Sequence, residues 1–134
     1  MSGYQGYVTS RPFMGTRVPQ HVQNIVIRDY CNRMGFNYLL SGTEYAIPNS
    51  YLILQSLLEN LSGIHGIVAY SLMQMPTDLF HRRAIFLEII KQGKSLHFAV
   101  EGLSIKCELD IRRVDDIWNI SEVIRSQPNV QELI

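Results

Sequence analysis

The sequence predicts an α/β fold, a three-layer sandwich in which a mainly parallel sheet of about four strands lies between helices. Short stretches rich in Tyr, Val and Ile alternate with longer stretches whose apolar residues recur every three or four positions. The length of 134 residues suits one domain, residues 1–134, with its own core. Alternating strands and helices favour parallel pairing with right-handed crossovers, in the order βαβαβαβα.

Four stretches have the composition of strands. GYVTS at 6–10 and the stretch 38–43 carry residues that suit a pleated sheet. GIVAYSL at 66–72 is almost continuously apolar, which is typical of a strand covered on both faces. The fourth stretch, 96–100, follows a helical segment that ends at Gly93.

Four helices are expected between and after these strands. The first begins at Pro19 and ends at Gly35, and the second covers 50–61 with Asn49 or Ser50 as its N-cap. The third covers 77–92 and the last covers 108–126. Because the third helix is apolar on more than one side, we expect the chain to form a homo-oligomer.

Composition excludes several functional classes. The chain has 12 basic and 12 acidic residues, and this balance argues against a nucleic-acid partner. No apolar run reaches the roughly 18 residues of a membrane span, and the start MSGYQGYV lacks the pattern of a secretory signal. We therefore expect a cytoplasmic protein. Cys31 and Cys107 lack a CxxC spacing, so neither a metal nor a cofactor is expected.

Polar residues gather where the predicted strands end. In an open parallel sheet, ligands bind beyond the carboxyl ends of the strands, so residues that follow a strand are site candidates. The candidates at the strand ends are Ser10, Arg11, Glu44, Tyr45, Tyr70, Ser71 and Glu101. The loop and helix start after the first strand add Arg17, Gln20 and His21. The segment Met73–Pro76 also follows a strand, and its methionines suit an adaptable binding surface.

These residue types allow several roles. Arg11 and Arg17 beside a helix start suit a phosphate or carboxylate, although they equally suit solvent or an acidic partner. Glu44 and Glu101 suit acid/base catalysis, or else a structural network with the arginines. Ser10 is a candidate nucleophile or a hydrogen-bonding residue. Gln20, His21, Tyr45, Tyr70 and Ser71 are candidates for contacts with the substrate.

Residues 4–102 resemble the catalytic domain of serine recombinases of the resolvase type. The likeness rests on the opening strand GYVTS with Ser10, the helical stretch QNIVIRDYC, and a third strand followed by a helix. It implies a resolvase-like fold, with a flavodoxin-like fold as the alternative. In those enzymes the third strand leads into an Asp-Arg-Leu-x-Arg segment that activates the serine. The corresponding stretch here, YSLMQMPTD, has no arginine, so DNA strand exchange is the least favoured function.

A second resemblance covers nearly the whole chain. The blocks GYVTSRPFMGTRVPQHVQNIVIRDYC, YLLSGTEYAIPNSY, GIVAYSLMQMP and LHFAVEGL are similar to the sporadic carbohydrate cluster proteins of bacteria. That resemblance implies a role in the synthesis of a surface polysaccharide or an unusual sugar. The leading hypothesis is an enzyme acting on a phosphorylated or nucleotide-activated sugar. The alternative is a protein that binds the sugar or assembles the pathway without catalysis.

Overall fold

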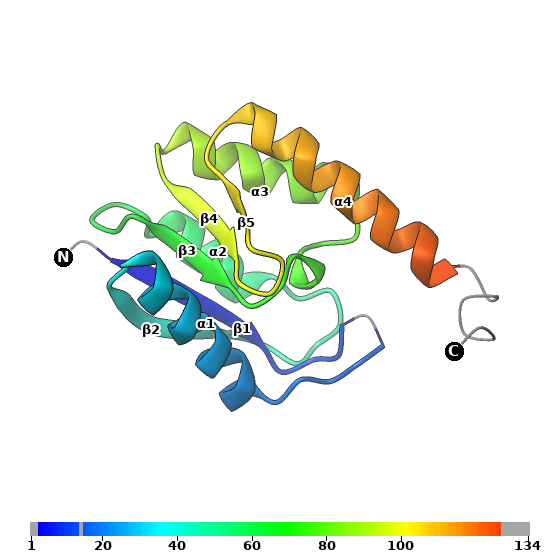
Figure 1. Ribbon diagram of the computed structural model, residues 1–134, viewed down its shortest axis with the longest axis horizontal. Helices are drawn as coiled ribbons and strands as arrows, with labels where there is room; N and C mark the ends of the chain where they lie inside the picture. The colour runs from blue at the N-terminus through cyan, green and yellow to red at the C-terminus, as the bar shows by residue number, and fades with distance from the viewer. Residues whose placement is uncertain (1–2, 14, 127–134) are drawn as a thin grey trace.

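The structure is a computed structural model that describes residues 3–13 and 15–126. A five-stranded sheet forms its centre, with helices on both faces (Figure 1). Its elements are β1 (Tyr4–Thr9), α1 (Gln20–Met34), β2 (Tyr38–Glu44), α2 (Leu52–Glu59), β3 (Gly66–Ala69), the 3₁₀ turn η1 (Leu72–Gln74), α3 (Leu79–Lys91), β4 (Ser95–Phe98), β5 (Leu103–Ile105) and α4 (Glu108–Ser126).

The sheet confirms the predicted α/β class and adds one strand. Its order is β2-β1-β3-β4-β5, and β1, β2, β3 and β4 pair in parallel. β5 pairs antiparallel with β4 and was missed by the sequence prediction. It is only three residues long and follows a tight turn at Gly102, whose φ of 68° favours glycine. So short a hairpin strand carries too few residues to show a period of two.

The helices form two layers around the sheet. α1 packs on one face, where Ile27 and Tyr30 meet Val8 and Val68. α2, α3 and α4 cover the other face and bury Tyr7, with the rest of the larger core, under them. These two clusters make the three-layer sandwich that the sequence predicted. The carboxyl ends of the parallel strands consequently lie at one edge, where their loops meet.

Two local predictions at that edge were wrong. The strand expected over 66–72 stops at Ala69, because Ser71 and Gln74 form a capping box that starts η1. Neither Asn49 nor Ser50 caps α2, whose N-cap residue is Tyr51 and makes no side-chain cap bond. The carboxylate of Glu44 accepts the N–H groups of that helix instead.

A buried histidine lies under α1. His97 in β4 is 1% exposed and sits among the rings of Tyr4, Tyr30 and Phe36. Its Nδ1 lies 2.9 Å from the Tyr30 hydroxyl, and its Nε2 lies 2.9 Å from Ser95 Oγ. Burial, together with the positive charge of Lys106, lowers the pKa of His97 to about 4. The folded protein therefore holds this imidazole neutral near pH 7.

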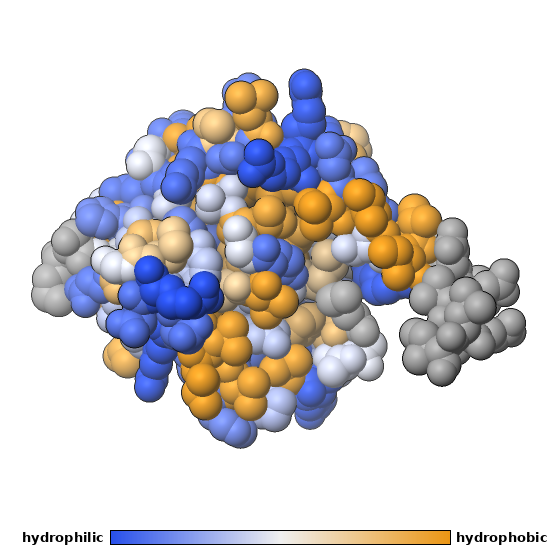
Figure 2. All heavy atoms as spheres, viewed as in Figure 1, coloured by the Kyte–Doolittle hydropathy of each residue, from blue (hydrophilic) through white to orange (hydrophobic). Residues whose placement is uncertain are grey.

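The helical surface carries exposed apolar side chains. On α3, Phe80 and Leu87 are exposed, and on α4 so are Ile120, Val123 and Ile124. Figure 2 shows apolar residues along the flank of α4. In the parts of the chain that the structure describes, no helix is both long enough and apolar enough to cross a bilayer.

His97 predicts how stability depends on pH. Its pKa of about 4 in the folded state lies below the 6.5 of an ordinary histidine, so acid favours the unfolded chain. The contribution is complete above pH 6.5 and is lost as the pH falls toward 4. Between pH 7 and pH 5 we expect a loss of about 2 kcal/mol.

Urea unfolding at pH 7 and pH 5 measures this loss. His97→Gln should flatten the dependence, whereas His21→Gln, which alters an exposed side chain, should leave it as in the original protein. Equal pH dependence in the original chain and in His97→Gln would contradict the assignment.

Candidate functional site

A pocket of about 220 Å³ lies at the carboxyl edge of the sheet. The loop after β1, the segment before α2, the segment around η1 and the later half of α4 surround it. Its walls are Arg11, Pro12, Phe13, Pro48, Asn49, Tyr51, Met73, Gln74, Met75, Thr77, Trp118 and Arg125. Both charged residues in this lining are arginines, so the pocket is positive.

Arg11 is the charged residue that β1 delivers to this edge. Its Nη1 donates to the carbonyl oxygen of Ser50 at 2.7 Å, and its guanidinium carbon lies 4.7 Å from the centre of the Tyr51 ring. Its Nη2 is buried without a hydrogen-bond partner among the described residues. A buried donor without a partner costs about 1–3 kcal/mol, so an acceptor placed there would be stabilising. The guanidinium also lies close to the hydroxyl of Tyr7, so Arg11 places a positive charge between the core and the pocket wall.

α4 supplies a second arginine, Arg125, and the flat apolar ring of Trp118 to the pocket wall. Trp118 and Arg125 lie seven residues apart, which places them on one face of the helix. Among the described residues, Arg125 pairs with the exposed Glu122 at 3.0 Å, and its Nε donates to the carbonyl oxygen of Ser121 at 3.4 Å. Exposed pairs of this kind contribute about 0–1 kcal/mol, so a ligand anion can compete for Arg125.

Glu44, predicted as a catalytic acid or base, is deeply buried beside the pocket and does not line it. It is 1% exposed, and its carboxylate accepts hydrogen bonds from the hydroxyl of Tyr7 and from the N–H groups of Ile53 and Leu54. Ser50 Oγ also donates to it. Burial and the adjacent Glu44 raise the pKa of Tyr7 far above its usual range, so the phenol keeps its proton.

Glu101, the second predicted acid/base residue, joins β4 to η1. Its Oε2 accepts from Ser71 Oγ at 2.7 Å, and its Oε1 accepts from the N–H of Leu72 at 3.0 Å. Within the described part of the chain, no ion pair links Glu44 or Glu101 to an arginine. The two carboxylates thus accept hydrogen bonds from backbone N–H and hydroxyl groups, and neither belongs to the pocket lining.

Gln23, which the sequence reasoning missed, organises the end of β1. It is fully buried in α1; its Nε2 donates to the carbonyl of Thr9, and its Oε1 accepts from the N–H of the same residue. Gln74 Nε2 donates both to Gln23 Oε1 and to Thr9 Oγ1. Gln74 also lines the pocket, so this network fixes one wall. The available signal was the helical spacing of position 23 from Ile27, Tyr30 and Cys31, which share its buried face, but the exposed Ile25 and Met34 obscure that period.

The remaining predicted residues are scattered along the edge. Ser10 Oγ donates to the carbonyl oxygen of Glu44 at 3.3 Å, and the ring of Tyr70 packs edge-on against Phe13. Four of them are exposed and do not line the pocket: Arg17, Gln20, His21 and Tyr45. Of all the predicted site residues, only Arg11 is in the lining, together with Met73, Gln74 and Met75 of the methionine-containing segment.

Other hollows exist on the surface. Grooves of about 420 and 410 Å³ lie between α2 and α3 and between α3 and α4; two glutamates and a histidine line the first, and the second mixes acidic and basic residues. A cavity of about 400 Å³ at the opposite edge of the sheet carries His65, Lys94 and Lys106. No cluster of three or more His, Cys, Asp or Glu side chains suited to a metal occurs among the described residues.

Comparison with solved structures finds the same fold in recombinase domains. A resolvase family site-specific recombinase from Streptococcus pneumoniae aligns with a TM-score of 0.64 at 11% identity, over 97% of this chain and 93% of that chain. The N-terminal catalytic domain of TP901-1 integrase aligns with a TM-score of 0.59 at 14% identity, over 90% and 96%. At these identities the likeness shows the fold alone.

The resolvase-like fold expected from the sequence is therefore confirmed. No family model and no curated protein matches the chain. The resemblance to the sporadic carbohydrate cluster proteins thus stays a prediction from sequence blocks.

Gln23 and Gln20 give a matched test of the network. Gln23→Ala should lower the free energy of unfolding by about 2–4 kcal/mol, because buried groups of Thr9 and Gln74 lose their partners. Gln20→Ala, in the same helix but exposed, should change it by less than about 0.5 kcal/mol. Chemical denaturation of both variants measures the difference, and similar values for the two would contradict the network.

Glu44 and Glu59 give a second pair of variants, one buried and one exposed, whose stabilities should differ. Glu44→Gln should destabilise the fold by about 1–3 kcal/mol, because an amide NH₂ would replace an acceptor that faces N–H and O–H donors. Glu59→Gln at the exposed end of α2 serves as the control and should be near neutral. Thermal unfolding distinguishes them; a fully stable Glu44→Gln protein would contradict the structural role.

Proposed function

We propose that the chain binds a small phosphorylated ligand, with a sugar phosphate as the expected class, in the pocket between Arg11 and Arg125. One observation carries the proposal: the pocket's charged lining consists of two arginines, and a buried donor of Arg11 lacks a partner among the described residues. Guanidinium groups bind phosphate oxygens through charge-assisted hydrogen bonds. The rings of Phe13, Tyr51 and Trp118 supply flat surfaces for the apolar face of a sugar.

The size of the pocket limits the ligand. Ligand pockets are usually about 300–1,000 Å³, and this one is smaller, about 220 Å³. One sugar ring with a phosphate is the appropriate scale, whereas a nucleotide-activated sugar would extend beyond the walls. The carbohydrate class itself rests on the sequence resemblance and on the aromatic lining.

Binding is better supported than catalysis. The described lining contains no carboxylate and no imidazole, and the two predicted acid/base residues are engaged elsewhere. An enzymatic role would require Glu44 or Glu101 to leave its hydrogen bonds. We therefore place the non-catalytic sugar-binding role first, and the sugar-modifying enzyme second.

DNA strand exchange is the other candidate, and the likeness to recombinase domains favours it. Three features of this chain oppose it. The stretch after β3 lacks arginine, and Ser10 Oγ donates to a backbone carbonyl instead of contacting an activating base. A formal net charge of zero also suits a small anion better than duplex DNA.

Self-association in the cytoplasm remains part of the proposal. The exposed apolar residues of α3 and α4 support it, since burying them between copies would remove apolar area from water. Sedimentation of the purified chain would measure its mass in solution.

Thermal unfolding against a ligand panel tests the function. The panel contains inorganic phosphate, sugar phosphates, free sugars, nucleotide sugars and a short DNA duplex. A ligand at a hundredfold excess over its dissociation constant should stabilise the folded state by about 2.7 kcal/mol. We expect sugar phosphates to raise the melting temperature most; a rise with duplex DNA alone would favour the recombinase role.

Variants at Arg11 and Arg17 test whether the anion binds in the pocket or elsewhere on the surface. Arg11→Gln should weaken phosphate-ligand binding at least tenfold, because a charged hydrogen bond contributes about 1.5–3 kcal/mol. Arg17→Gln removes the same charge from an exposed position outside the lining and should change affinity less than about twofold. Calorimetric titration measures both, and equal losses in the two variants would place the anion outside the pocket.

A further inference from the structure

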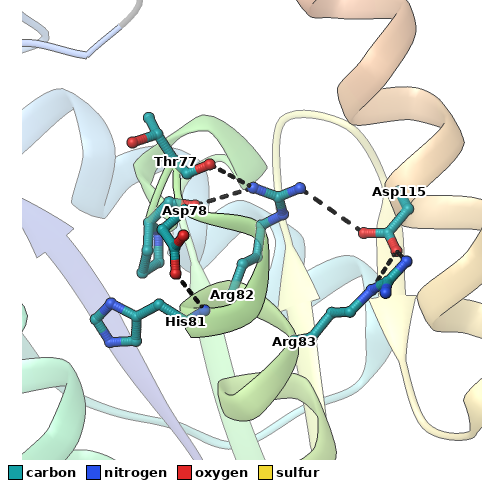
Figure 3. Close-up of polar contacts among 7 residues, drawn as sticks. Thr77, Asp78, His81, Arg82, Arg83 and Asp115 are labelled. Atoms are coloured by element: carbon teal, nitrogen blue, oxygen red, sulfur yellow. Dashed lines mark hydrogen bonds and ion pairs between the residues drawn. The ribbon is translucent and has the colours of Figure 1, made fainter.

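Arg82 is a buried arginine behind the pocket. It lies in the first turn of α3 with its side chain 2% exposed, and its Nη1 donates to the carbonyl oxygens of Pro76 at 3.1 Å and Thr77 at 3.2 Å. Its guanidinium carbon lies 4.0 Å from the centre of the Trp118 ring. Figure 3 shows the guanidinium reaching from α3 toward Asp115 on α4.

The polar contacts of Arg82 are incomplete. Its Nη2 lies 3.9 Å from Asp115 Oδ1, and neither Arg82 Nε nor Asp115 Oδ1 has a hydrogen-bond partner among the described residues. Arg83 binds the other oxygen of the same carboxylate at 3.0 Å. A buried ion pair with such geometry is a weak stabiliser, and an apolar residue of similar volume often serves as well. Stability alone therefore does not account for an arginine here.

The groups that Arg82 does contact belong to the pocket. Thr77 and Trp118 both line it, and Pro76 lies between two lining residues, Met75 and Thr77. One guanidinium thus joins the segment before α3 to the wall on α4. Because Trp118 and Arg125 share a face of α4, a shift of the helix where Arg82 contacts it would also move the cation of Arg125 at the pocket wall.

We propose that Arg82 is a positioning residue for the pocket: it fixes Trp118 against the Pro76–Thr77 carbonyls and so sets the distance between the pocket's two arginine-bearing walls. Arg82 touches no ligand itself. The proposal rests on the proposed phosphate-binding function for its affinity readout. The position of Trp118, its other readout, is independent of any ligand.

The single tryptophan of the sequence makes a direct experiment possible. Arg82→Met keeps an unbranched apolar stem and removes the planar charged group that stacks on the indole. We expect the emission of Trp118 to shift and its quenching by acrylamide to rise about twofold or more, as the ring gains exposure. The dissociation constant for inorganic phosphate should weaken about fivefold or more.

Arg83→Met is the matched control. Arg83 binds the same Asp115, yet it is 48% exposed and is not in the pocket lining. It should leave the emission, the quenching and the phosphate affinity unchanged. Arg82→Lys, which keeps the charge but loses the planar fork, should reproduce the spectral change, and it replaces Arg82→Met if that protein does not fold.

The outcomes separate the two proposals. A folded Arg82 variant with unchanged emission, quenching and phosphate affinity would overturn the positioning role. The same result in Arg83→Met as in Arg82→Met would also overturn it, because the effect would then belong to Asp115. If the original protein binds neither inorganic phosphate nor any sugar phosphate, the proposed function fails, while the tryptophan spectra still decide the role of Arg82.

Discussion

The candidate site depends on buried polar side chains that hydrogen-bond to the backbone where the strands end, at the carboxyl edge of the sheet. Strand ends leave backbone N–H and C=O groups that must be satisfied when loops cover them. Here side chains from other elements satisfy them: Gln23 of α1 binds both backbone groups of Thr9, and Glu44 of β2 accepts the first N–H groups of α2. These bonds fix where each loop leaves the sheet, and the loops make the walls of the pocket.

The hydrogen bonds of Glu44 and Glu101 give these two carboxylates structural roles. Glu44 ends β2 and Glu101 follows β4, at the edge where a catalytic acid and base would be expected, but β1 and β3 lie between these two strands. Both instead accept hydrogen bonds from backbone and hydroxyl donors and stand behind the pocket lining. The positive charge of Arg11 is left facing the pocket, beside a backbone that these carboxylates hold in place. An anion is the ligand that we propose for this edge.

The sequence predicted the class of fold, which is confirmed, and it placed the candidate site at the edge where the structure has a pocket, since both follow from periodicity and from the alternation of strands with helices. It missed β5, because three residues carry no usable period, and it missed the cap of α2, because Glu44 lies eight residues before the helix. Arg11 and the segment Met73–Met75 were found from their place after strands. Trp118 and Arg125 were not found, because they reach the pocket only through the tertiary packing of α4 at the end of the sheet. No local pattern in α4 predicts that packing.

The most direct test of the central claim is an NMR titration with inorganic phosphate, read at the backbone amides and at the indole N–H of Trp118. The account predicts shifts confined to residues around Arg11, Tyr51, Trp118 and Arg125, at the carboxyl edge of the sheet. Shifts confined to His65, Lys94 and Lys106 at the opposite edge would contradict it and assign the anion to the other cationic cavity.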